Sequence, residues 1–389
     1  MANTSEEHPC RLILDRCLRG EAWPAALLDR AMEEDDGRAF LSIVVERLGD
    51  LFEPRLGEVY RKLFTEVIER VAPEMRERVR GVQTSQRAPN GFQAKQVYVL
   101  SRITLGADVA VTSVLIDAAK RRFPDAGIVF VGPRKSYEMF EADARIIHFD
   151  VPYARGGSLR ERLRASADLW IDDGIVIDPD SRLTQLGLIS VCAPDRYFHF
   201  ESRSFGGDDT ERLPALASRW AHEALGVENA GAFVAPLPAE GEPPAITVSL
   251  GVGENPAKRI SGDFEIDLLA TLRTFGRSVL IDKGGSLEER ERVEQIVNQS
   301  RIPGVRLHDG SFAHFAAEIA RSRLYIGYDS AGGHVASACG VPVISIFAGA
   351  VSERFVARWR PIGTVIDAHT VSDVIGEVRR AAAEKIEIA

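Results

Sequence analysis

The chain has 389 residues, of which 45% are hydrophobic and 27% are charged, and these fractions are typical of a globular protein rather than a disordered or fibrous one. A single hydrophobic core rarely grows to this length, so we expect two or three domains. The formal net charge of -9 at pH 7 argues against an extended nucleic-acid-binding surface.

The first ten residues, MANTSEEHPC, are polar and acidic and do not have the pattern of a signal peptide. The four cysteines lie far apart without a CxxC or Cys/His cluster, which predicts reduced thiols and no metal site. No stretch predicts a membrane span, since the most apolar region, 324–351, contains Asp329, Pro342 and many glycines. We expect a cytoplasmic protein, with a peripheral position on the inner membrane face as the alternative.

Residues 1–92 are predicted to form an all-helical domain. Apolar residues recur at helical spacing through 24–32, 39–52 and 60–80. Pro24 suits a first helical turn, and Gly81 follows the last periodic residue. This accessory domain could form a homo-oligomer, contact a partner or touch a membrane surface, and the sequence leaves these alternatives open.

A different pattern begins near residue 93 and continues to residue 238. A short buried strand over 96–103 precedes a helix over about 109–122 and a second strand over 128–132. This order is a βαβ unit, which requires a parallel sheet. Further apolar runs at 144–149, 168–179 and 191–200 indicate more strands, so residues 93–238 are predicted to be a Rossmann-like domain.

The segment 236–244, PLPAEGEPP, is rich in proline and acidic residues and is predicted to be an interdomain linker. Strand and helix patterns then alternate again through 245–365, before a final helix over 366–389. Two doubly wound α/β halves leave a cleft between them, where the carboxyl ends of both sets of strands face each other.

The clearest motif in the second half is Asp329-Ser330-Ala-Gly332-Gly333-His334, which follows an apolar strand and opens a helix of small residues. Glycines without a Cβ let a ligand approach the backbone N–H groups, and the positive end of the helix dipole favours an anion. A helix cap with glycines for tight packing would produce the same pattern, so both interpretations stay open.

Two further turns carry charges at the ends of strands. Lys258 and Arg259 close a glycine-rich turn, where they could neutralise a departing phosphate, or could be a solvated basic pair. Asp108 follows Gly106 and Ala107 after the first strand of the first half. It could face the cleft and accept a proton from a hydroxyl, or it could only cap the next helix.

Taken together in this order, the motifs resemble those of glycosyltransferase family 9, the ADP-heptose:lipopolysaccharide heptosyltransferases, over roughly residues 96–365. The resemblance rests on Gly106-Ala107-Asp108, on Phe123-Pro-Asp-Ala126, on Lys258-Arg259, on Asp329 through His334 with Gly340-Val-Pro-Val343, and on Arg358-Trp-Arg-Pro361. Ala107 is an extra residue between the glycine and the aspartate. The family implies a GT-B fold, in which two Rossmann-like domains face a cleft, here preceded by the helical domain.

The resemblance also implies roles for individual residues. Asp108 would be the general base and Lys258 would contact the diphosphate as the second catalytic residue, without a metal. The nucleotide-sugar site would contain Gly106, Arg259, Glu288, Ser311, Phe312, Asp329, Ser330, Gly332, Gly333 and His334. Arg182 and Arg203 are candidate anion contacts for the acceptor.

The sequence therefore predicts a metal-independent inverting glycosyltransferase, which needs no cofactor beyond an ADP-sugar or another NDP-sugar donor. It would transfer a heptose or other hexose-like sugar to a hydroxyl of a glycan, lipid-linked or protein acceptor, as in lipopolysaccharide or other surface-glycan synthesis. Two alternatives remain: a GT-B-like binding or scaffold protein without catalysis, and a sugar-nucleotide epimerase or other two-Rossmann enzyme.

Overall fold

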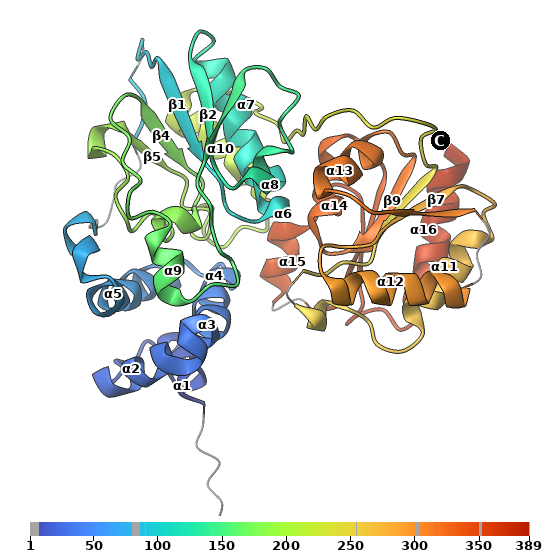
Figure 1. The fold of residues 1–389 in the computed structure, drawn as a ribbon, viewed down its shortest axis with the longest axis horizontal. Coiled ribbons are helices and arrows are strands. Elements are labelled where there is room, and N and C mark those ends of the chain that lie inside the picture. Colours follow the sequence, from blue (N-terminus) through green and yellow to red (C-terminus); the bar gives the residue numbers. More distant parts are fainter. Residues whose placement is uncertain are drawn as a thin grey trace, which may run out of the picture.

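The computed structural model describes residues 8–79, 86–89, 91–253, 255–300, 304–349 and 352–388. It contains a helical region at the amino end and two α/β domains, each built on a parallel sheet (Figure 1). This arrangement confirms the fold class that the sequence predicts. Gly81, expected to follow the last amino-terminal helix, lies outside the described residues.

The helical region consists of α1 (Pro9–Arg19), α2 (Ala25–Glu33), α3 (Arg38–Phe40), α4 (Glu46–Asp50) and α5 (Pro54–Val71), with a π-helical turn over Leu41–Val45 before α4 and a 3₁₀ turn over Pro73–Arg78 after α5. Its apolar core includes Phe64 and Val67 of α5, together with Leu159 and Leu163 of α9 (Leu159–Arg164) in the first α/β domain. The helical region is therefore docked on the first domain through a shared core, as Figure 1 shows.

The first domain has strand order β3-β2-β1-β4-β5, all parallel. Its elements are β1 (Gln96–Leu100), α6 (Leu105–Ala107), α7 (Ser113–Arg122), β2 (Gly127–Gly132), α8 (Arg134–Tyr137), β3 (Ile146–Asp150), α9, β4 (Ile175–Asp178), β5 (Tyr197–His199) and α10 (Leu213–Leu225). The expected strand over 168–173 is only a bridge between Ile171 and Cys192, because its neighbouring residues, among them Trp170, are exposed and give it no second buried face.

The second domain has strand order β11-β10-β9-β6-β7-β8, also all parallel. Its elements are β6 (Ile246–Ser249), α11 (Phe264–Arg273), β7 (Val279–Asp282), α12 (Leu287–Ser300), β8 (Val305–His308), α13 (Phe312–Ala320), β9 (Leu324–Tyr328), α14 (Ala331–Ala338), β10 (Val343–Phe347), α15 (Glu353–Trp359), β11 (Thr364–Asp367) and α16 (Val374–Ile388). The expected boundary at residue 365 falls within β11, because this strand pairs with β10 and completes the sheet.

The two sheets change direction at the same place. In the first sheet the strand order reverses between the neighbours β1 and β4, and in the second it reverses between the neighbours β6 and β9. Ligands of doubly wound sheets bind at this switch point, outside the carboxyl ends of the strands. The loops that follow β1, β4, β6 and β9 are therefore the places to look for a site.

The two α/β domains contact each other through α6 and α14. A Cβ on Gly106 would lie only 3.3 Å from the Cα of Ala331 and 3.2 Å from the imidazole of His334, so the absence of a side chain lets the two helices approach. Arg358 of α15 adds a polar link, because its buried guanidinium donates to Asp209 and to the carbonyl of Gly207 in the first domain.

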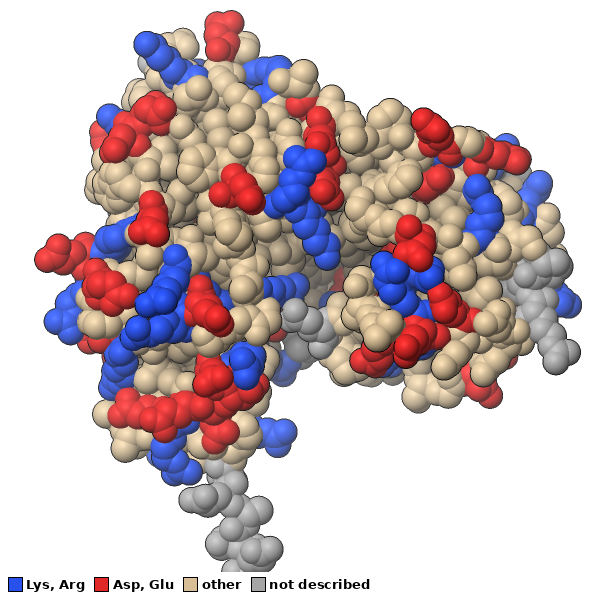
Figure 2. Space-filling view, viewed as in Figure 1, with Lys and Arg blue, Asp and Glu red and all other residues tan. Residues whose placement is uncertain are grey.

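The visible surface carries both signs of charge. On the face in view, Figure 2 shows lysines and arginines interspersed with aspartates and glutamates over the helical region and both domains. Within the described part of the chain, no helix is long and apolar enough to cross a membrane.

Candidate active site

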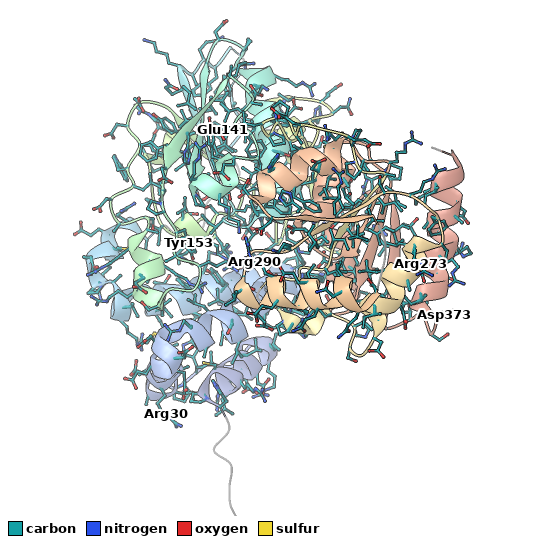
Figure 3. All side chains as sticks on the ribbon, turned by 45° about the vertical axis from the view of Figure 1, so that its right-hand side comes forward. Arg30, Glu141, Tyr153, Arg273, Arg290 and Asp373 are labelled. Carbon is teal, nitrogen blue, oxygen red and sulfur yellow. The ribbon has the colours of Figure 1, made fainter. Side chains whose placement is uncertain are left out.

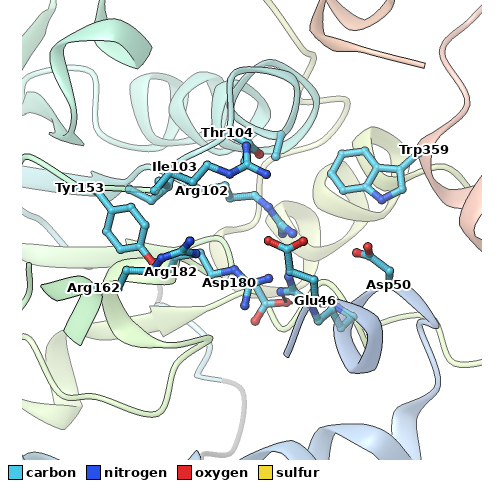
Figure 4. Close-up of a pocket in the computed structure, with 13 residues that line it drawn as sticks. Glu46, Asp50, Arg102, Ile103, Thr104, Tyr153, Arg162, Asp180, Arg182 and Trp359 are labelled. Atoms are coloured by element: carbon cyan, nitrogen blue, oxygen red, sulfur yellow. Dashed lines mark hydrogen bonds and ion pairs between the residues drawn. The ribbon is translucent and has the colours of Figure 1, made fainter. Parts of the chain in front are cut away.

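A polar pocket lies at the switch point of the first sheet, with a cavity volume of about 130 Å³ (Figure 4). Residues after β1 and β4 form one wall, the loop that follows β3 and the start of α9 form another, and α4 and α15 close it. The lining residues are Glu46, Asp50, Arg102, Ile103, Thr104, Ala107, Tyr153, Arg155, Arg162, Asp180, Arg182, Arg203 and Trp359. Figure 3 shows Tyr153 between the first domain and the helical region.

Five arginines and three carboxylates give the pocket a positive balance. Arg102 is held by the carbonyl of Pro179 at 2.7 Å, and Arg203 pairs with Asp180 at 3.1 Å. The guanidinium of Arg182 has no hydrogen bond or ion pair with any described residue, although the charges of Glu46 and Asp50 act on it. Arg182 is therefore the arginine best placed to receive an anionic group from a ligand.

The carboxylate of Asp180 holds several of these pocket side chains in place. Its buried carboxylate accepts from Ser202 at 2.8 Å, lies 3.1 Å from the Nε2 of His199 and pairs with Arg203. Burial alone would raise the pKa of Asp180, but the hydrogen bond from His199 and the charges of Arg203 and Arg102 lower it well below its usual value. A carboxylate so strongly stabilised as an anion is a structural anchor.

Asp108 does not face the cleft, contrary to expectation. Its carboxylate has no exposed surface and accepts hydrogen bonds from the Ser101 hydroxyl at 2.8 Å, the Arg102 backbone N–H at 2.7 Å and the Thr112 hydroxyl at 2.8 Å. The physical reason is the extra residue, Ala107. The chain absorbs it by widening the next turn into a π-helix over Asp108–Thr112, and the aspartate turns toward the loop that follows β1. Its proposed role as general base stays a prediction, but not one that its position supports.

The second domain places its charges at the other switch point, after β6 and β9. The Nζ of Lys258 lies 2.6 Å from a carboxylate oxygen of Asp329, and Asp329 is 8% exposed. Ser330 occupies the cap position before α14, but its hydroxyl makes no capping bond and instead lies 3.3 Å from the hydroxyl of Tyr325. The first N–H groups of α14 thus lie beside a lysine.

His334 lies in the first turn of α14, buried, with its ring 5.7 Å from that of Trp359. Burial and, to a smaller extent, the positive charge of Lys258 together lower its pKa to about 4, against the opposing effect of Asp329. The imidazole is therefore neutral at pH 7 and can donate one hydrogen bond without adding a charge. The guanidinium of Arg102, in the first domain, lies 5.9 Å from the centroid of the same Trp359 ring. Trp359 therefore contacts residues of both switch points.

One of the two glycines of α14 has the packing role that the sequence left open as an alternative. A Cβ on Gly332 would lie 2.4 Å from the hydroxyl of Tyr325 and 2.6 Å from its ring, so the packing against Tyr325 requires a glycine here. Gly333 is buried too, but its nearest neighbours lie at 3.8 Å. At Gly332 the space that the missing side chain leaves is filled by Tyr325, and the contact of either glycine's backbone with a phosphate stays a prediction.

The remaining expected donor contacts lie apart from this cluster. Glu288 is exposed in the first turn of α12, and Arg259 is half-buried after the 3₁₀ turn of Lys258. Ser311 caps α13 by accepting from the N–H of His314, and Phe312 packs edge-on against Phe315. These residues follow β6, β7 and β8 and so share the carboxyl edge of the sheet, and their contacts to a nucleotide stay predictions.

Sequence reasoning missed several pocket residues. Two of them could have been found from the sequence, because Trp359 belongs to the Arg-Trp-Arg-Pro motif and Asp180 is two residues before the candidate acceptor contact Arg182. Glu46 and Asp50 belong to a helix with ordinary amphipathic spacing, and nothing in their local sequence distinguishes them from solvated acids. Only the docking of α4 brings them to the pocket.

Comparison with known proteins gives three results. Residues 242–373 match the model of glycosyltransferase family 9 (heptosyltransferase). No curated protein matches the sequence. Among solved structures, a glycosyl transferase family 9 protein from Veillonella parvula superposes with a TM-score of 0.55 at 18% identity, covering 76% of this chain and 98% of its own.

Two Escherichia coli structures are similar to the same extent. Heptosyltransferase WaaC with ADP has a TM-score of 0.55 at 15% identity, covering 75% of this chain and 99% of its own. ADP-heptose lps heptosyltransferase II has a TM-score of 0.53 at 15% identity, covering 76% of this chain and 100% of its own. At these identities the structural likeness concerns the fold, and the family match concerns the second domain.

Proposed function

We propose that this chain, whose residues 242–373 match the model of glycosyltransferase family 9, is a GT-B glycosyltransferase that transfers a sugar from a nucleoside-diphosphate donor to a hydroxyl of an anionic acceptor, with inversion and without a metal ion. One observation carries the proposal. The Lys258–Asp329 pair lies beside the first turn of α14, and Trp359 contacts His334 of that helix and also lines the arginine-rich pocket of the first domain, so the switch points of the two sheets are close together.

The donor side supplies positive potential where negative charge grows. In an inverting transfer the acceptor oxygen attacks the anomeric carbon while the nucleoside diphosphate departs from the opposite face, through a transition state with oxocarbenium character. Lys258, the N–H groups that open α14 and the neutral imidazole of His334 lie together there. One preorganised donor to such charge contributes about 3–4 kcal/mol, so this set could act in place of a divalent cation.

The acceptor side selects for negative charge. The guanidinium of Arg182 has no partner in the described part of the chain, and Arg155 and Arg162 line the same pocket, which fits a phosphate or carboxylate on the acceptor better than a neutral sugar. A sugar phosphate, a lipid-linked saccharide phosphate and an acidic glycan share this chemistry. Acceptors of these three kinds should therefore be assayed alongside a neutral sugar.

The donor half of the proposal is tested by nucleotide binding. ADP, UDP and GDP are added to the purified protein, and the melting temperature is followed; a nucleotide at 100 times its Kd stabilises the folded state by about 2.7 kcal/mol. Lys258→Ala should weaken the binding of the stabilising nucleotide about 10- to 100-fold by calorimetry, because a charge-assisted contact is lost. Lys135→Ala, at an exposed lysine of α8, is the matched control.

Each outcome has a clear meaning. Binding that depends on Lys258, together with sugar transfer that persists in EDTA, supports the proposal. Absence of binding by all three nucleotides would contradict it, and loss of transfer in EDTA would refute metal independence. Nucleotide binding with no transfer to any acceptor of the panel would favour the alternative of a binding protein without catalysis.

A further inference from the structure

A glycosyl transfer of this kind needs a base near the acceptor hydroxyl, and the residue expected to supply it is enclosed. Asp108 is fully buried and already accepts three hydrogen bonds. A base must come within hydrogen-bond reach of the proton that it removes. The pocket itself contains three other carboxylates, which belong to Asp180, Glu46 and Asp50.

Asp180 is a poor candidate. Its carboxylate is engaged by His199, Ser202 and Arg203, and removal of its charge would release that whole cluster. The positive charges that lower its pKa also make it a weak proton acceptor.

Asp50 has the opposite surroundings. It is the last residue of α4, it is half-buried, and its carboxylate makes no hydrogen bond or ion pair with any described residue. Figure 4 shows it rising from the helical region toward Trp359. Burial raises the pKa of Asp50, while the charges of Arg203, Arg182 and Lys258 oppose this rise and Glu46 reinforces it. A raised pKa strengthens a carboxylate as a base.

The position of Asp50 comes from the pocket that it lines together with Arg182, Arg203 and Trp359. Trp359 belongs to the second domain and contacts His334 of α14, so it lies between this pocket and the donor side. The charge of Lys258, which contacts Asp329 on the donor side, also acts on Asp50. Glu46 lies one helical turn earlier, at the start of α4, and lines the same pocket, so it is the carboxylate against which Asp50 has to be tested.

We propose that Asp50, contributed by the helical region, is the general base of the transfer. Its carboxylate takes the proton of the acceptor hydroxyl as the hydroxyl oxygen bonds to the anomeric carbon. The bond from that carbon to the diphosphate oxygen breaks, and its electron pair leaves with the nucleoside diphosphate. The inference rests on the proposed function, and it gives the helical region a catalytic purpose, because the site is incomplete without α4.

The test compares Asp50→Asn with the wild type in the full-length chain. The donor is the commercially available sugar conjugate of whichever nucleotide stabilises the protein, and release of the nucleotide is measured with water and with a panel of sugar phosphates. Asp50→Asn should lower kcat about 10²- to 10⁴-fold and flatten the acidic limb of the pH–rate profile, while the Kd of the free nucleotide stays within about twofold.

Three further variants distinguish the loss of a base from a loss of activity that is caused by a disturbed fold. Asp50→Ala should regain activity when formate is added, because a small carboxylate can occupy the vacated space. Glu58→Gln, at an exposed acid of the neighbouring helix α5, should retain wild-type activity and is the matched control. Asp108→Asn should keep the acidic limb of the pH–rate profile even if it lowers the stability of the fold, because Asp108 is not the base in this proposal.

The outcomes separate this inference from the proposed function. Wild-type kcat and pH profile in Asp50→Asn, in a protein that binds nucleotide and transfers sugar, would overturn the assignment and leave the function intact. Loss of the acidic limb in Asp108→Asn or Glu46→Gln instead of Asp50→Asn would also overturn it. Loss of nucleotide binding in the wild type would overturn the proposed function itself.

Discussion

Lowering the pH should destabilise the fold through His334, because this histidine is neutral in the folded protein and is protonated once the chain unfolds. Its imidazole is buried against Trp359, and burial lowers its pKa to about 4. In the unfolded chain its pKa is about 6.5. Between these two values the unfolded state binds a proton that the folded state does not, so the free energy of unfolding falls as the pH falls.

The magnitude follows from the two pKa values. Their difference of about 2.5 corresponds to about 3 kcal/mol once the pH is below both, and the part developed between pH 7 and pH 5 is about 2 kcal/mol. Carboxylates contribute to the same slope as the pH falls toward 5. The contribution of His334 is therefore the difference between the wild type and His334→Gln, which has no titrating group at this position.

Two measurements test this reasoning. Urea unfolding at pH 7 and pH 5, at equal ionic strength, should show the wild type losing about 2 kcal/mol more than His334→Gln. An NMR titration of ¹³C-labelled histidines, with the signal assigned by its absence from His334→Gln, should place the pKa near 4. A His334 that titrates near 6.5, or equal losses in the two proteins, would refute the role given to burial.

Two other perturbations separate packing from ligand contact. Gly332→Ala should lower stability by about 1–3 kcal/mol, measured by thermal unfolding, because its Cβ would overlap the ring of Tyr325, whereas Gly333→Ala has room and should be nearly neutral. If Gly332→Ala weakened only nucleotide binding, the glycine would be open to the ligand after all. Arg358→Met should cost roughly 2–4 kcal/mol, since the buried guanidinium links α15 to Asp209 and the carbonyl of Gly207. An unchanged melting temperature would show that this interdomain link is not stabilising.

The architecture of the two α/β domains could be predicted from local pattern. Buried apolar strands such as 324–328 and 343–347, separated by a helix of small residues, are consistent only with a parallel sheet covered by helices, and the structure has that arrangement. The charged turn at Lys258 and the motif from Asp329 to His334 could also be assigned to one edge of the sheet. Parallel strands bring their carboxyl ends together, so the pairing of Lys258 with Asp329 follows from the topology.

The direction of individual side chains could not be predicted in the same way. Asp108 matches a motif by residue type, but the insertion of Ala107 widens a turn, and the carboxylate finds three donors in the interior instead of the cleft. Gly332 matches a phosphate-binding pattern, but the ring of Tyr325 occupies the space that a side chain would need. Residue type and spacing are the same in both interpretations, and only the packing distinguishes them.

By itself, the sequence determined which segments become strands and helices, and which turns carry charge at the ends of the strands. These properties depend on the spacing of apolar residues and on neighbours within a few positions. Only the tertiary structure decided that Asp50 of the helical region meets Arg182 and Trp359, residues more than a hundred positions away along the chain. The physical reason is that such a meeting depends on how whole elements dock, and docking is set by the shapes of the buried faces together rather than by any one stretch of sequence.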